Sequence, residues 1–181
     1  MLMPKNRFWL LASILIFSSA AFAGVKVAFF EAKDSSGQLI TMEDGGRFYH
    51  VAISVDDKWL HTHVYWGVQL IPDLHQLGEP ALILENEKSP GLQEADLKQF
   101  LNQRYDSTYS WSNPDKTYCS KLVAQILNVA PSPMTFSGTI WRGKTSGYSR
   151  ELGVSPDDLY RELKKRGFKP AGGLCQQVFK K

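Results

Sequence analysis

Residues 47–71 read RFYHVAISVDDKWLHTHVYWGVQLI, and this stretch decides the fold. Apolar and polar side chains alternate over residues 47–55, as they do in a β-strand with one buried face. Asp56-Asp57 supplies a two-residue turn, and the alternation resumes over residues 58–71. The pattern therefore predicts a β-hairpin whose second strand runs from residue 58 to residue 71.

The register of this hairpin places three histidines on one face. With Asp56-Asp57 as the turn, His50 lies opposite His63, and His61 lies opposite Ala52. Because strand side chains alternate from face to face, all three imidazoles project the same way. One could act as a general base and a second could orient its ring. Three histidine ligands would also suit a catalytic zinc ion, so both interpretations stay open here.

Cys119 is placed at the start of a helix. The residues that follow it carry apolar side chains with helical spacing, at Leu122, Val123, Ile126 and Leu127. A helix N-terminus lowers the pKa of a thiol and leaves backbone N–H groups free to stabilise an oxyanion. Cys119 is therefore a candidate nucleophile. The alternative is a structural disulfide with Cys175, because the chain has two cysteines.

The remaining patterns predict a single α+β domain over residues 24–181. Strands are expected at 25–30 and 81–84, and a helix at 92–105. Ser155-Pro156-Asp157-Asp158 has the N-cap, N1 proline and N3 acid that begin a helix, and Gly167 would end it. An extended loop is expected over 131–149, and a last strand would hold Phe168 and Val178.

Residues 1–23 have the pattern of a signal peptide. Lys5 and Arg7 precede an apolar run over residues 8–17, and Ala21-Phe22-Ala23 forms a small-residue cleavage site. The apolar run is about half of the roughly 20 residues that a membrane-spanning helix needs. We therefore expect cleavage near Ala23 and a secreted or periplasmic mature chain without a membrane span.

The charge of the chain gives no reason to expect nucleic acid as a partner. The net charge is +3, and removing Lys5 and Arg7 with the signal peptide leaves +1. The net charge of a nearly neutral domain gives no electrostatic argument for nucleic acid or for an anionic membrane surface as a partner. The sequence contains no phosphate-binding loop and no motif typical of a metal site, so we expect no cofactor and no metal. The oligomeric state is left open.

Two segments resemble a known superfamily. Gly46-Arg47-Phe48-Tyr49-His50-Val51-Ala52-Ile53 resembles the catalytic-histidine strand of the NlpC/P60 superfamily of papain-like cysteine hydrolases. Tyr118-Cys119-Ser120-Lys121-Leu122-Val123 resembles the helix start of its circularly permuted YiiX/YebB-like branch, in which the cysteine follows the histidine as it does here. The resemblance covers most of residues 25–168. It implies a papain-like NlpC/P60 fold in permuted order, with an antiparallel sheet packed against helices.

The resemblance also implies roles for the candidate residues. Cys119 matches the nucleophile and His50 the general base, while His61 best matches the third, orienting residue and His63 is its alternative. The implied activity is that of a thiol hydrolase, a cysteine peptidase or amidase. Because exported members often cut amide or peptide bonds of peptidoglycan, stem peptides of the cell wall are the first expected substrate.

Two other functions are carried forward. One is a lipid or thioester acyl hydrolase, which an apolar groove beside Cys119 would favour; its expected lining is Trp59, Trp66, Phe136 and Trp141. The other is a non-catalytic periplasmic binding domain, in which Cys119 and Cys175 form a disulfide.

Overall fold

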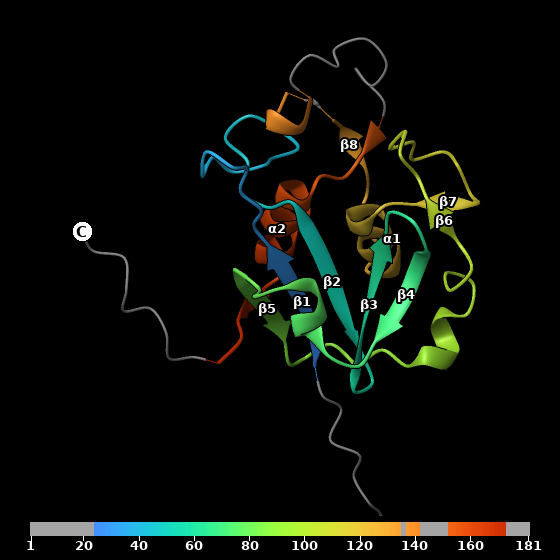
Figure 1. Ribbon diagram of the computed structural model, residues 1–181. Coiled ribbons are helices and arrows are strands. Elements are labelled where there is room, and N and C mark those ends of the chain that lie inside the picture. The colour runs from blue at the N-terminus through green and yellow to red at the C-terminus, as the bar shows by residue number, and fades with distance from the viewer. Residues whose placement is uncertain (1–23, 135–136, 142–151, 173–181) are drawn as a thin grey trace, which may run out of the picture.

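A computed structural model of the protein describes residues 24–134, 137–141 and 152–172 (Figure 1). The predicted signal peptide lies outside the described residues. So do Cys175, Val178, Phe136 and the part of the predicted loop from 142 to 149.

The centre of the molecule is a six-stranded sheet in the order β10-β5-β1-β2-β3-β4, with every neighbouring pair antiparallel. Its strands are β1 (Val25–Phe30), β2 (His50–Val55), β3 (Lys58–His63), β4 (Gly67–Ile71), β5 (Leu82–Asn86) and β10 (Lys169–Pro170). The first strand matches its predicted bounds. The strand predicted at 81–84 is β5, displaced toward the C-terminus, and β10 begins just after Phe168. The predicted α+β class is confirmed.

The predicted hairpin is present as β2 and β3. Val55 pairs with Lys58 and Ile53 with Leu60, which is the predicted register, and Asp56 turns the chain with a φ of 50°. The prediction of one continuous strand over residues 58–71 was wrong, because the chain reverses at residues 64–66 and returns as β4. Gly67 permits this turn: its φ is +71°, and a Cβ there would collide with the carbonyl oxygen of Gln103.

Two helices pack against one face of the sheet, behind it in Figure 1. They are α1 (Cys119–Ile126) and α2 (Pro156–Lys165). As predicted, α1 begins at Cys119. It ends at Ile126, because Asn128 takes a φ of 52°, before Pro131 is reached. The predicted capping box of α2 is formed by Ser155 and Asp158, and Gly167 follows the helix with a φ of +85°.

The main core lies between the sheet and these helices. Alternate residues of β2, namely Val51, Ile53 and Val55, point into it together with Leu122 of α1 and Leu159 of α2. The opposite face of the sheet is covered in part by η1 (Leu74–Leu77), a short 3-10 helix. None of the helices in the described ranges has the length and apolar character that crossing a bilayer requires.

The prediction of a helix over residues 92–105 was wrong. The segment forms only a short 3-10 helix, η2 (Glu94–Leu97), and its N-cap residue Gln93 provides no side-chain hydrogen bond. Leu97 and Phe100 still reach the core through turns, so burial of apolar residues did not require a continuous helix. Tyr105 instead enters a two-stranded parallel ladder and pairs with Thr117.

The remaining elements are short. They are β6 (Arg104–Tyr105), β7 (Lys116–Thr117), β8 (Ser132–Pro133), β9 (Leu152–Gly153) and η3 (Thr139–Trp141). The antiparallel pair β8–β9 and η3 fall in and just after the segment predicted as an extended loop, so its described part is not wholly irregular.

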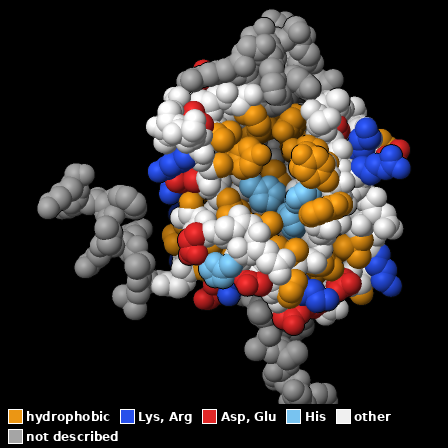
Figure 2. Space-filling model, viewed as in Figure 1, with side chains coloured by type: hydrophobic (Ala, Val, Ile, Leu, Met, Phe, Trp, Pro, Cys, Tyr) orange, Lys and Arg blue, Asp and Glu red, His pale blue; other side chains and the backbone are white. Residues whose placement is uncertain are grey.

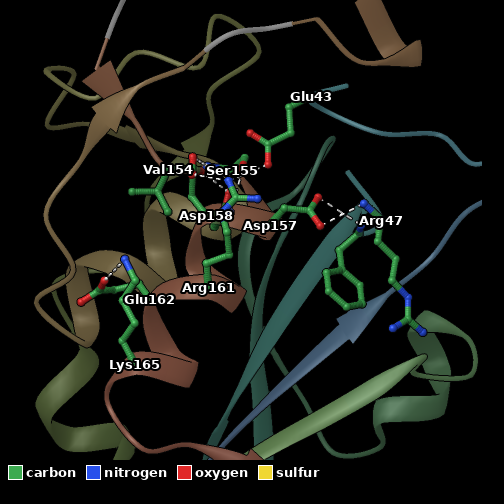
Figure 3. Close-up of polar contacts among 11 residues, drawn as sticks. Glu43, Arg47, Val154, Ser155, Asp157, Asp158, Arg161, Glu162 and Lys165 are labelled. Atoms are coloured by element: carbon green, nitrogen blue, oxygen red, sulfur yellow. Dashed lines mark hydrogen bonds and ion pairs between the residues drawn. The ribbon is translucent and has the colours of Figure 1, made fainter. Parts of the chain in front are cut away.

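A buried carboxylate fixes the segment that leads into β2 (Figure 3). Asp157, in the first turn of α2, accepts hydrogen bonds from the backbone N–H groups of Arg47 at 2.9 Å and Phe48 at 3.2 Å. Burial raises the pKa of this carboxyl, and the two backbone donors oppose that rise. At Gly46 a Cβ would come within 2.8 Å of the same carboxylate. The N-terminus of α2 therefore sets where His50 begins β2.

We predict that Asp157→Ala lowers the free energy of unfolding by about 2–4 kcal/mol, because two backbone donors, that of Phe48 buried and that of Arg47 partly buried, lose their acceptor. Urea unfolding monitored by circular dichroism would measure the change. Asp73→Ala is the matched control: Asp73 also accepts a backbone hydrogen bond, but at the exposed start of η1. A cost for Asp157→Ala no larger than that of the control would contradict the anchoring role.

Candidate active site

A cavity of about 350 Å³ opens where β2 begins and β3 ends. Cys119 of α1 lines it together with His50, His61 and His63 from the hairpin. Figure 2 shows histidine side chains in a hollow bordered by hydrophobic groups. The structure thus brings together all four residues that the sequence singled out.

The neighbours of Cys119 hold it at the cavity. The hydroxyl oxygen of Tyr118 accepts a hydrogen bond from the backbone N–H of Val154 at 3.2 Å. The hydroxyl of Ser120 donates to the carbonyl oxygen of the same residue at 2.7 Å. Both side chains are fully buried, so the first turn of α1 is fixed on either side of Cys119.

Lys121 adds a third anchor. Its ammonium group donates to the carbonyl oxygens of Ser110, Asn113 and Lys116 at 3.0, 2.6 and 2.8 Å. The residue is 1% exposed, and burial lowers the pKa of its amino group. One buried cation therefore ties α1 to the loop that follows Tyr109.

The thiol of Cys119 is protonated in the resting protein. Burial raises its pKa to about 11, although hydrogen bonds from the backbone N–H groups of Val51 and Ser120 oppose the rise. The sequence had suggested a lowered pKa at the helix N-terminus; here the loss of hydration outweighs the helix end. Cys119 is a free thiol, while Cys175, its candidate disulfide partner, lies outside the described residues.

His50 and His61 form a neutral pair. Their ring centroids lie 5.5 Å apart with an interplanar angle of 86°. Burial, and after it the neighbouring His61 and His63, lower the pKa of His50 to about 3. Burial, and after it His63, lower the pKa of His61 to about 4. Nε2 of His50 and Nδ1 of His61 are buried without a hydrogen-bond partner in the described part of the chain.

His63 lies farther out. Its ring centroid is 6.4 Å from that of His61, and it stacks on Trp66 at 4.2 Å. Its Nδ1 accepts a hydrogen bond from the backbone N–H of Tyr65 at 3.2 Å. The geometry therefore favours His61 over His63 as the neighbour of His50. Among the residues described, no group of three or more His, Cys, Asp or Glu side chains is placed to hold a metal ion, so the zinc alternative gains no support.

Four tyrosines complete the lining, and the sequence analysis did not identify them. They are Tyr49, Tyr105, Tyr109 and Tyr118. The hydroxyl groups of Tyr105 and Tyr109 lie 3.0 Å apart, and burial raises the pKa of Tyr105, so its hydroxyl stays protonated. Tyr49 and Tyr118 directly precede His50 and Cys119, so their position next to the candidate catalytic residues could have identified them as part of the site. Tyr105 was expected as a buried residue of the predicted helix over 92–105 rather than in the site, and no local signal marked Tyr109.

The described lining contains no lysine or arginine. Its acid, Glu31, is paired with Arg47. Of the four aromatic residues expected to line a groove, two were predicted wrongly: Trp59 packs against the apolar cluster beneath η1, and Trp66 is not part of the cavity lining. Phe136 and the side chain of Trp141 lie outside the described residues. The wall is instead built from tyrosines and from apolar residues such as Phe30, Met42 and Leu77.

Comparison of the chain with protein-family models, curated proteins and solved structures finds no match.

We predict that iodoacetamide alkylates Cys119 slowly at neutral pH and about tenfold faster for each pH unit up to about pH 10, because only the thiolate reacts. Mass mapping of the labelled peptide would follow the rate. The urea-unfolded protein is the control, since its thiols regain their ordinary pKa. A rate that is already at its plateau below pH 7 would show a resting thiolate and contradict the neutral site.

The lowered histidine pKa values predict acid sensitivity. Below a pH of about 6.5 the unfolded chain protonates both histidines. The folded protein does not protonate them until about pH 4 for His61 and pH 3 for His50. Unfolding therefore takes up protons in this window, so stability falls as the pH falls, by about 1.4 kcal/mol per pH unit for each histidine.

His50→Gln should accordingly reduce the slope of unfolding free energy against pH by about 1.4 kcal/mol per unit between pH 6 and 4. Urea titrations at several pH values would measure this slope, with substitution of the exposed His75 of η1, His75→Gln, as the control. Equal slopes for His50→Gln and wild type would show that His50 is protonated normally in the fold.

Proposed function

We propose that the protein is an exported cysteine-dependent acyl hydrolase with the permuted NlpC/P60 architecture. The observation that carries the proposal is the shared cavity, which Cys119, the first residue of a helix, lines together with His50 and the neighbouring His61. The order of elements supports the architecture, because the histidine hairpin precedes the cysteine helix and an antiparallel sheet packs on that helix. Export rests on the signal-peptide pattern of residues 1–23.

In the proposed reaction, His50 takes the thiol proton of Cys119 as the sulfur attacks a substrate carbonyl. Because both groups are neutral at rest, proton transfer accompanies the attack rather than preceding it. His61 acts as the positioning residue for the His50 ring. Backbone N–H groups at the start of α1 stabilise the oxyanion. His50 then protonates the leaving group, and water attacks the resulting thioester to release the acid and restore the thiol.

The amide or peptide bonds of cell-wall stem peptides remain the first substrate class, on the ground of export. A second candidate, a lipid or thioester acyl hydrolase, is favoured by a specific observation. Stem peptides carry free carboxylates, and the described lining offers no lysine or arginine to pair with them. Tyrosines and apolar side chains suit an uncharged acyl group instead. The non-catalytic alternative requires Cys119 in a disulfide, whereas the thiol described here is free and lines a cavity.

We predict that Cys119→Ala and His50→Ala each lower kcat/KM on activated acyl esters by at least about a thousandfold, since they remove the nucleophile and the base. His61→Ala should cost about tenfold to a hundredfold, mainly in kcat, because it acts through His50. Steady-state kinetics with nitrophenyl esters of increasing chain length would measure these changes and rank the two substrate classes against soluble stem peptides.

His63→Ala is the matched control and should remain within about threefold of wild type. Intact-mass spectrometry of a slow substrate should trap an acyl group on Cys119. Full turnover by Cys119→Ala, or an acyl group on another residue, would refute the mechanism. A larger loss for His63→Ala than for His61→Ala would reassign the positioning residue.

A further inference from the structure

Exposed hydrophobic side chains gather at the mouth of the cavity. In the described part of the chain five large hydrophobic residues are exposed, and four of them form what we name the aromatic rim: Tyr49, Val64, Tyr65 and Trp66, exposed by 43, 54, 83 and 70%. Tyr49 and Val64 also line the cavity. Contiguous exposure of this kind marks an interaction surface.

Contacts with His63 hold the β3–β4 part of the aromatic rim in place. Trp66 stacks on His63 with 4.2 Å between ring centroids and an interplanar angle of 18°. The Tyr65 N–H donates to the same imidazole, and Gly67 closes the turn. One face of the tryptophan is therefore fixed against the site while most of its surface meets solvent. Tyr65 and Trp66 lie in the turn that joins β3 to β4, at one end of that hairpin (Figure 1).

Two cations stand beside this turn. The N–H of Val68 donates to the carbonyl oxygen of Gln103 at 3.0 Å, which brings β6 against the start of β4. Arg104 of β6 pairs in register with Lys116 of β7, and both are exposed. Within the described residues neither side chain forms an ion pair with an acid, although Asp115 is adjacent in sequence. Their charges are available to a partner.

We infer that the aromatic rim docks the protein on the surface of a phospholipid bilayer, with Arg104 and Lys116 against lipid phosphates. Tryptophan and tyrosine favour the boundary between headgroups and acyl chains, because each joins an apolar ring to a polar group. Adjacent cations complement phosphate charge. A hairpin end with three consecutive exposed apolar residues can enter this boundary without unfolding.

The inference rests on the proposed function for its purpose and extends it to the source of the substrate. Docking by the rim places the cavity mouth, lined by Tyr49 and Val64, against the bilayer. An acyl ester of a membrane lipid could then reach Cys119 without crossing water. The tyrosines and apolar side chains of the described cavity wall, in which the one acid, Glu31, is paired with Arg47, suit such a group.

The test is flotation of the full mature protein with vesicles of phosphatidylcholine, with and without phosphatidylglycerol. Wild type should float with both, and Tyr65→Ser/Trp66→Ser should lower the partition coefficient by at least about tenfold. Leu152→Ser is the matched control, because Leu152 is the fifth exposed residue, at 50%, and lies outside the rim. Brominated lipid should quench tryptophan emission in wild type and quench less in Trp66→Phe.

Arg104→Gln/Lys116→Gln should weaken binding only to vesicles that contain phosphatidylglycerol. Failure of wild type to float, or flotation equal in wild type and the rim variant, would overturn the inference. The inference would also be overturned if wild type formed dimers and bound no vesicles while the rim variant stayed monomeric. The rim would then join two copies of the chain. Cys119→Ala should float like wild type, because docking does not need the thiol. Turnover of a soluble ester tests the hydrolase mechanism without the membrane, so failure of one proposal is distinguishable from failure of the other.

Discussion

The pairing of β2 with β3 in one register is the constraint on which the rest of the structure depends. Val51, Ile53 and Val55 must face the helices to complete the core, and this forces His50 to the opposite face. A shift of one residue would exchange the two faces. The site forms only at the end of the sheet, where β2 begins beside the start of α1. There the N–H of Val51 reaches the thiol of Cys119, although the helix covers the other face.

Burial governs the chemistry available at this place. The same loss of hydration raises the pKa of Cys119 and lowers that of His50, so each stays neutral. A preformed thiolate and imidazolium would stabilise each other, but both would need to be charged away from water. The site therefore keeps its thiol protonated until a substrate carbonyl provides a place for the charge.

Buried polar anchors, rather than apolar packing alone, set the positions of the two candidate catalytic residues. Asp157 holds the backbone before His50 through two N–H groups, and Lys121 holds the loop beside α1 through three carbonyls. Ser120 and Tyr118 both bind Val154. These contacts give Tyr118, Ser120 and Lys121 a structural role. Within residues 118–121, only the side chain of Cys119 takes no part in these anchoring hydrogen bonds.

Local patterns were sufficient for the elements whose signals lie within a few residues. The β2–β3 register follows from the alternation and the two-residue turn. The start of α1 at Cys119 follows from the apolar spacing after it, and the capping box of α2 was predicted from four consecutive residues, 155–158. Together these also predicted that His50, His61 and His63 share a face. The turn before Gly67 was missed, however, because the spacing of two over Trp59, His61, His63 and Tyr65 continues up to it, although Val64, Tyr65 and Trp66 break the alternation of apolar and polar residues. Apolar spacing over residues 92–105 likewise resembled a helix that tertiary burial satisfied with turns.

The sequence by itself therefore determined the hairpin, the helix start and the identity of the thiol and imidazoles. Tertiary structure decided that His61 rather than His63 lies against His50, that Tyr105 and Tyr109 enter the wall, and that the thiol is neutral. The physical reason is that distance and hydration depend on which distant segments close over a group. Neither quantity is encoded in the spacing of neighbouring residues.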